Sequence, residues 1–115
     1  MITLFTPQNV AITDGDYGKV TGSFKRIGSI LIFSFYIALT KEYSTNNDAL
    51  FTFNTIKSSA RYDFPAYTSH ATSIQVYDLL IPNSSDTPNF NIGNDISIPV
   101  GTTIFCSGTL LVTDK

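Results

Sequence analysis

The residues best suited to binding chemistry gather in one ten-residue segment, Arg61 to His70. The segment holds an arginine, an aspartate, three aromatic side chains and the only histidine of the chain. Aromatic faces stack on sugar rings, while arginine, aspartate and histidine form directional hydrogen bonds with hydroxyl groups. The segment therefore predicts a carbohydrate site. Its candidate side chains are Arg61, Tyr62, Asp63, Tyr67 and His70, with Tyr43 as a weaker candidate of the same kind.

A packing role is the competing interpretation of this segment. Phe64 and Tyr67 would then close one end of a hydrophobic core, and the segment would be a mid-chain loop ordered by their rings. The residue types alone leave both interpretations open.

No constellation in the sequence predicts catalysis. Cys106 is the only cysteine, so it forms no intrachain disulfide, and its apolar neighbours are typical of a small buried hydrophobe. A thiol nucleophile would need a base, and nothing in the sequence brings His70 to Cys106. The carboxylates are scattered in turn contexts, which gives no pair facing each other across a cleft. We therefore expect a protein that is not an enzyme.

The sequence also lacks a recognisable metal or cofactor site. One cysteine and one histidine do not provide zinc-ligand spacing. Asp14-Gly15-Asp16 lacks the later ligands of a calcium loop and is typical of a turn. No glycine-rich loop opens a helix to hold phosphate. We expect no metal and no cofactor.

The composition favours one domain with an uncharged polar surface. The chain has 115 residues, of which 43% are hydrophobic and only 14% charged, against roughly 25% charged in typical soluble domains. It contains 12 serines, 15 threonines and 8 asparagines, which suit either hydrogen bonding to sugars or a simple β surface. The net charge is -2, so binding to nucleic acid or to anionic membranes is disfavoured.

The N-terminus and the hydropathy pattern bear on location. Met1 is not followed by a basic region and a cleavage site, so we expect no signal peptide and synthesis in a cytoplasm. The longest apolar stretch, Ile30 to Leu39, is well short of the roughly 20 residues that a membrane-spanning helix needs. We expect no membrane insertion.

Hydrophobic residues alternate with a period of two from residue 30 to residue 39, which predicts a β-strand. One face carries Leu31, Phe33, Phe35, Ile37 and Leu39. The other face carries Ile30, Ile32, Tyr36 and Ala38, so it too is largely apolar. Such a strand either lies centrally in a sandwich or has its second face covered by a partner.

Further short strands are predicted over residues 19–26, 50–54, 72–81 and 102–113, with turn residues between them. Gly108, inside the last of these, indicates a bulge or a close backbone approach. No window shows helical spacing with caps. The pattern predicts an all-β fold, an antiparallel β-sandwich that is jelly-roll-like, although pattern alone does not fix the strand order. We expect the sandwich over residues 16–115, preceded by an N-terminal arm or joining segment over residues 1–15.

The strand pattern resembles a family of small β-domains at the tips of bacteriophage tails and baseplates. The segments that carry the resemblance are residues 17–24, 27–35, 50–53, 79–81 and 98–111, the last beginning Ile-Pro-Val-Gly-Thr-Thr. The resemblance implies a homotrimeric, jelly-roll-like head in a virion that binds a host cell-surface saccharide or anchors other virion proteins. We expect such a receptor-binding head. The alternative is a purely structural virion connector or capsid decoration protein without a ligand.

Overall fold

The computed structural model describes residues 6–43, 48–90 and 97–115. It confirms an all-β, antiparallel β-sandwich, because the described residues form strands and no helix. The strands are β1 (Gln8–Asn9), β2 (Ile12–Asp14), β3 (Val20–Ile27), β4 (Ile30–Ala38), β5 (Phe51–Phe53), β6 (Ile56–Ser58), β7 (Tyr62–His70), β8 (Ser73–Ile81), β9 (Asn89–Phe90) and β10 (Thr103–Asp114).

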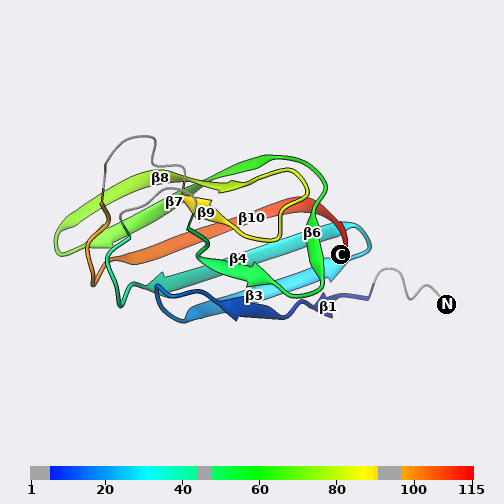
Figure 1. Ribbon diagram of the computed structural model, residues 1–115, viewed down its shortest axis with the longest axis horizontal. Helices are drawn as coiled ribbons and strands as arrows, with labels where there is room; N and C mark the ends of the chain where they lie inside the picture. Colours follow the sequence, from blue (N-terminus) through cyan, green and yellow to red (C-terminus); the bar gives the residue numbers. More distant parts are fainter. Residues whose placement is uncertain (1–5, 44–47, 91–96) are drawn as a thin grey trace.

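One long sheet dominates the molecule, with the strand order β1-β3-β4-β10-β7-β8-β9 (Figure 1). Two hairpins, β3–β4 and β7–β8, lie on either side of β10. β10 pairs with β4 from Thr103 opposite Ala38 to Leu111 opposite Ile30. Its pairing with β7 is much shorter and ends where Phe105 lies opposite Tyr67. β10 is therefore the strand that joins the two hairpins into one sheet.

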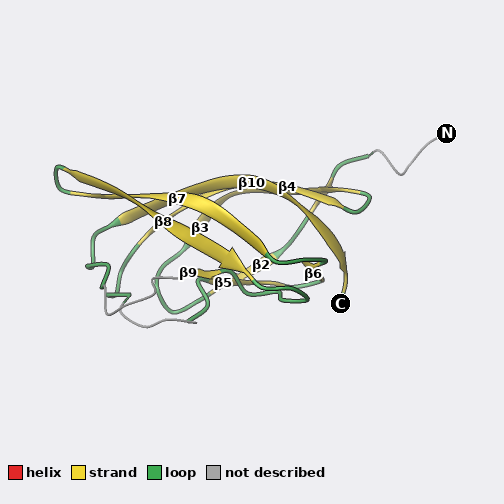
Figure 2. Cartoon of the chain, turned by 90° about the horizontal axis from the view of Figure 1, so that it is seen from above, coloured by secondary structure: helices red, strands yellow, loops and turns green. Residues whose placement is uncertain are grey.

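The second layer consists of short strands on one side of the long sheet (Figure 2). β2 pairs with β5 in a separate two-stranded sheet, and β6 pairs with the end of β10. β9, the last strand in the order of the long sheet, pairs with β8 and lies with these short strands. The two layers are therefore unequal, and in this respect the sandwich departs from a regular jelly roll of two similar sheets. We call the side of the long sheet that faces this layer the inner face and the opposite side the outer face.

The core lies between the two layers and is rich in phenylalanine. On β4, Leu31, Phe33, Phe35 and Ile37 are buried, and the residues between them are exposed. The face assignment made from the sequence is therefore confirmed. The ring of Phe24 packs edge-on against Phe51 with 5.4 Å between centroids, which ties β3 of the long sheet to β5 of the short layer.

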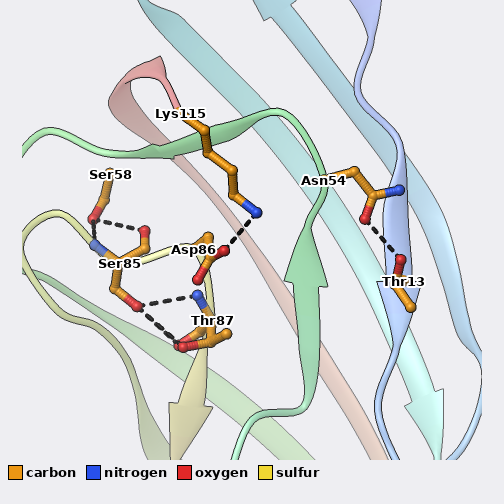
Figure 3. A network of polar contacts seen from close by, with 7 residues as sticks. All are labelled: Thr13, Asn54, Ser58, Ser85, Asp86, Thr87 and Lys115. Carbon is orange, nitrogen blue, oxygen red and sulfur yellow. Dashed lines mark hydrogen bonds and ion pairs between the residues drawn. The ribbon is translucent and has the colours of Figure 1, made fainter.

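Polar contacts fasten the short strands to the loop between β8 and β9 (Figure 3). The Ser58 side chain is buried and donates a hydrogen bond of 2.6 Å to the Pro82 carbonyl. Its oxygen also accepts a hydrogen bond of 3.2 Å from the Ser85 amide. Lys115 forms an ion pair of 2.5 Å with Asp86 in the same loop. These contacts satisfy polar groups at the edge of the core, as burial requires.

The segment predicted as an N-terminal arm or joining segment, residues 1–15, includes two short strands. Residues 8–14 contain β1 and β2, which pair with β3 and β5 respectively. Ile12 is half-buried against the core and lies opposite Phe53. Burial of this apolar side chain is a physical reason for the pairing. Residues 1–5 of the predicted arm lie outside the described residues.

Residues 62–70 form a strand, β7, and not the loop expected from the sequence. Pro65 fits there because the ladder between β7 and β10 ends at Tyr67 and does not reach residue 65. The Pro65 carbonyl faces β10, since the Cys106 thiol donates to it at 3.8 Å. In a β-strand the amide and the carbonyl of one residue face the same neighbouring strand, so the Pro65 nitrogen also faces β10. No ladder hydrogen bond forms there, so the N–H that proline lacks is not needed.

Candidate functional site

The six residues predicted as a saccharide site do not come together. Side chains alternate along β7, so Asp63 and Tyr67 lie on the outer face, while Tyr62 and His70 lie on the inner face. Tyr62 and His70 are also eight residues apart on an extended strand, about 26 Å at ~3.3 Å per residue. No single sugar ring contacts both.

Three of the six residues make contacts near the start of β7. The Tyr62 ring stacks on the Phe64 ring at a centroid distance of 5.8 Å, and its hydroxyl accepts a hydrogen bond of 3.0 Å from the Leu111 amide. Arg61 lies 3.7 Å from the carboxylate of Asp63, and both side chains are exposed. Such an exposed ion pair contributes little to stability. The contact between Tyr62 and Phe64 therefore supports the packing interpretation for Phe64.

Tyr43 is a core residue. Its side chain is fully buried, packing edge-on against Phe90 at 5.5 Å between centroids. The hydroxyl donates 2.8 Å to the Asp48 carbonyl and accepts 3.2 Å from the Phe90 amide. Burial raises the pKa of this hydroxyl, the Phe90 hydrogen bond lowers it, and the Asp48 carboxylate raises it. No surface of Tyr43 is left for a ligand, so we exclude it from the site.

His70 lies in a pocket of about 230 Å³ at the tip of the β7–β8 hairpin. The pocket is bounded by inner-face residues of the hairpin and by the segment that leads into β10. Its lining residues are Thr68, His70, Ser73, Gln75, Tyr77, Ser97, Ile98, Pro99 and Thr102. The volume lies just below the roughly 300–1,000 Å³ of pockets for drug-sized ligands, so a ligand of about one ring is the better match.

The pocket forms because the hairpin extends beyond the hydrophobic core. Along the inner face of β8, buried Ile81 and Leu79 give way to Tyr77, Gln75 and Ser73 toward the tip. A two-residue turn at 71–72 then reverses the chain, with Ala71 at φ 53°. A left-handed conformation is costly for a residue other than glycine. The turn follows directly on the last pair of the β7–β8 ladder, His70 opposite Ser73, so these two pocket residues lie next to each other.

Hydrogen bonds within the chain hold part of the lining in place. The Tyr77 hydroxyl donates to the side-chain oxygen of Gln75, and the Thr68 hydroxyl donates 3.1 Å to the Gln75 carbonyl. Within the described part of the chain, the side chains of His70 and Ser73 make no hydrogen bond. Their polar atoms therefore have no partner among the described residues.

The described part of the pocket lining carries almost no charge. Among the described lining residues there is no aspartate, glutamate, lysine or arginine, and His70 is the only titratable side chain besides Tyr77. Burying a charged ligand group without a partner is expensive, so this lining favours an uncharged ligand. Hydroxyl, amide and imidazole groups, together with the rings of Tyr77 and Pro99, suit a polyhydroxylated ring.

Sequence reasoning found His70 but missed the rest of this pocket. A usable signal exists on β8, where Ser73, Gln75 and Tyr77 continue the face of Leu79 and Ile81 with a period of two. A face that changes from apolar to polar along one strand indicates that the strand extends past the core. Ser97, Pro99 and Thr102 carry no local signal, because their position depends on distant pairing.

Tyr67 borders a different, shallower hollow of about 310 Å³ on the outer face. Ser34, Pro65, Phe105 and Ser107 line it as well. It lies where β7 and β10 cease to pair. It shares no lining residue with the His70 pocket.

The Cys106 thiol has the character of a core group. Its side chain is buried, as expected from the sequence, and desolvation raises its pKa to about 12. A thiol with such a pKa is almost entirely protonated near neutral pH and is a poor nucleophile. Among the described residues, no three His, Cys, Asp or Glu side chains form a group able to hold a metal ion.

Comparison of the chain with models of protein families, with curated proteins and with solved structures gave no match. The described residues include no helix long and apolar enough to cross a membrane. We therefore infer function from the geometry of the chain itself.

Proposed function

We propose that this chain is a non-enzymatic saccharide-binding domain whose pocket at the tip of the β7–β8 hairpin holds one neutral sugar ring. The observation that carries the proposal is the lining of this pocket, which combines uncharged hydrogen-bonding groups with ring faces. Sugars present hydroxyl groups that both donate and accept, and apolar C–H faces that pack on rings.

The roles of individual side chains follow from their contacts. The amide nitrogen of Gln75 donates to a sugar hydroxyl, while its oxygen remains bonded to Tyr77. His70 and Ser73 supply the groups that have no hydrogen-bond partner within the described residues. Tyr77 and Pro99 supply the packing surfaces on opposite elements of the pocket.

The setting we propose is a phage-type virion, in which the saccharide belongs to the surface of a host cell. The support for this setting is the resemblance of the strand pattern to tail-tip and baseplate domains. A connector or decoration protein without a ligand is the second candidate. The exposed apolar side chains of the outer face favour it, because such surfaces mark contacts between proteins.

A titration with neutral saccharides tests the binding role. We expect wild-type protein to bind a subset of neutral bacterial wall saccharides on a glycan array, with affinity measured by calorimetry or NMR. Gln75→Ala and His70→Ala each remove a hydrogen bond to the ligand, so each weakens binding about tenfold, the equivalent of ~1.4 kcal/mol. Arg61→Ala is the matched control, because Arg61 lies in the same predicted segment but outside the pocket, and it leaves affinity unchanged.

Two results would contradict the proposal. One is the absence of binding across the neutral saccharides by protein that is folded by circular dichroism. The other is binding that Gln75→Ala and His70→Ala leave intact, which would place the ligand elsewhere. Tight binding to another virion protein that tolerates both pocket variants would favour the connector.

A further inference from the structure

The outer face of the long sheet carries an unusual concentration of exposed apolar side chains. Eight of the nine large hydrophobic residues that are exposed in the described part of the chain lie on this face. They are Ile30, Ile32, Tyr36, Tyr67, Ile74, Val76, Phe105 and Leu111. No described segment covers this side of the sheet, whereas the short strands cover the other side (Figure 2).

These side chains form continuous contacts across strands. Tyr36 lies opposite Phe105, which lies opposite Tyr67, which lies opposite Val76, so one apolar row crosses β4, β10, β7 and β8. The rings of Tyr36 and Phe105 are 6.0 Å apart. Between 44% and 54% of each of these four residues remains exposed. Tyr36 in this row belongs to the second apolar face of residues 30–39. For that face the sequence predicts either a central place in a sandwich or a covering partner.

The area of the outer face matches that of a stable interface. Nine-residue strands at ~3.3 Å per residue are about 30 Å long, and five strands at ~4.8 Å span about 24 Å. The face therefore presents roughly 700 Å², close to the ~800 Å² that each partner buries in a standard protein–protein interface.

The sizes of the side chains suit contact with another sheet. The long sheet bows along its strands, with the outer face on the convex side (Figure 2). Small Ser34 and Ser107 lie opposite each other near the middle of β4 and β10. Larger residues, Ile30 and Tyr36 among them, lie toward both ends of the strands. Small residues at the crest, with larger ones on either side, reduce the curvature of this surface and favour interdigitation with a second sheet.

Charges of opposite sign lie at the two edges of this face. Lys25 lies on β3, one strand beyond Ile32, and its ammonium contacts the side chain of Asn9 with no carboxylate partner in the described residues. Asp78 lies on β8 at the opposite edge, beside Pro65 of β7, and likewise has no ion pair within the described residues. The outer face therefore carries one positive charge on β3 and one negative charge on β8.

We propose that the outer face binds a second copy of this chain, in a face-to-face pair whose two-fold axis runs parallel to the strands. This axis places β3 of each copy over β8 of the other, so that Lys25 approaches the partner's Asp78 at both edges. A two-fold axis across the strands would instead place Lys25 on Lys25 and Asp78 on Asp78. Like charges in contact disfavour that arrangement, so the edge charges select the first one.

The pair leaves the His70 pocket open, because the side chains that line the pocket belong to the inner face. Each pair would therefore carry two saccharide pockets on its two outward sides. The homotrimer implied by the phage-type resemblance would use a heterologous contact, which does not pair a face with itself. The mass in solution distinguishes the two assemblies.

Light scattering across the micromolar range tests the proposal. We expect a mass twice the 12.6 kDa of the chain. Tyr67→Asp places a charge in the apolar row and reduces the mass to that of one chain. Val100→Asp is the matched control, since Val100 is 56% exposed, similar to the 54% of Tyr67, but lies in the turn before β10. We expect this variant to remain a pair.

A charge exchange tests the orientation of the copies. Lys25→Asp and Asp78→Lys each put like charges at both edges, and each raises the dissociation constant about tenfold or more. The double variant restores opposite charges and recovers most of the affinity. A wild-type protein with the mass of one or three chains would overturn the two-fold pair. So would equal effects of Tyr67→Asp and Val100→Asp, and a double variant no tighter than the singles would overturn the stated axis.

Discussion

Gly108 provides a sharp test of how the two hairpins pack onto β10. It lies on the inner face of β10 opposite Phe33, and the Phe64 ring of β7 lies over it. A Cβ atom at this position would lie 2.6 Å from Cε1 and 2.7 Å from Cδ1 of Phe64, and 3.2 Å from Cε2 of Phe33. The close backbone approach indicated by the sequence is therefore made by an aromatic ring, which must move when glycine is replaced.

The free energy of unfolding of Gly108→Ala follows from two opposing effects. Overpacking of a filled core costs about 1–3 kcal/mol. Replacing glycine by alanine in a strand recovers roughly 0.5–1 kcal/mol of backbone entropy. We therefore expect a net loss of about 1–2 kcal/mol. In a Phe64→Ala background only the 3.2 Å contact with Phe33 remains, so Gly108→Ala should cost little or stabilise the protein by up to about 0.5–1 kcal/mol.

Urea unfolding of the four proteins in this double-mutant cycle provides the measurement. Circular dichroism and tyrosine fluorescence report the transition, because the chain contains no tryptophan. The coupling energy between the two sites should be about 1–3 kcal/mol, which lies within the ~0.5–3 kcal/mol found for residues in contact. An equal loss in both backgrounds would refute the reasoning, because it would show that the Phe64 ring does not limit the space at Gly108.

Two further predictions concern the hairpin turn and the buried thiol. Ala71→Gly removes the cost of φ 53° at the turn, so it should raise the free energy of unfolding by up to about 1 kcal/mol, measured by urea unfolding; a loss would contradict a strained turn. The Cys106 thiol, with its pKa raised to about 12, should react with thiol reagents at pH 8 far more slowly in the folded than in the urea-unfolded protein. Above about pH 9 the unfolded thiol loses its proton while the folded one keeps it, so this group lowers stability as pH rises toward 12. Cys106→Ala should lack this part of the alkaline decline, and an equal decline in both proteins would contradict it.

The strands with strong alternation were predictable from the sequence. The apolar face of residues 31–39 is buried in β4, since a period of two in an extended chain places these residues on one side. The exposed apolar second face was also visible in the sequence. What the pattern left open was whether the chain itself covers that face, because this depends on where the short strands pack.

β7 was misread because its sequence contains Pro65 and many polar residues. Proline is accepted there only because the ladder with β10 ends at Tyr67, and that endpoint depends on a strand about forty residues further along the chain. The candidate site was partly missed for the same reason. His70 meets Pro99 and Thr102 through sheet pairing, which local spacing does not encode.

The place of β10 in the sheet has a consequence for synthesis of the protein. β10 is the last of the described strands to leave the ribosome, yet it supplies the shared edge of both hairpins. Until it emerges, β4 and β7 of the nascent chain each present unpaired amide and carbonyl groups, which can recruit strands from other chains. Long-range pairing of this kind also folds slowly. Crowded polysomes and high expression rates should therefore favour aggregation of this protein, whereas slower translation or a chaperone that shields open strand edges should raise the yield of folded chains.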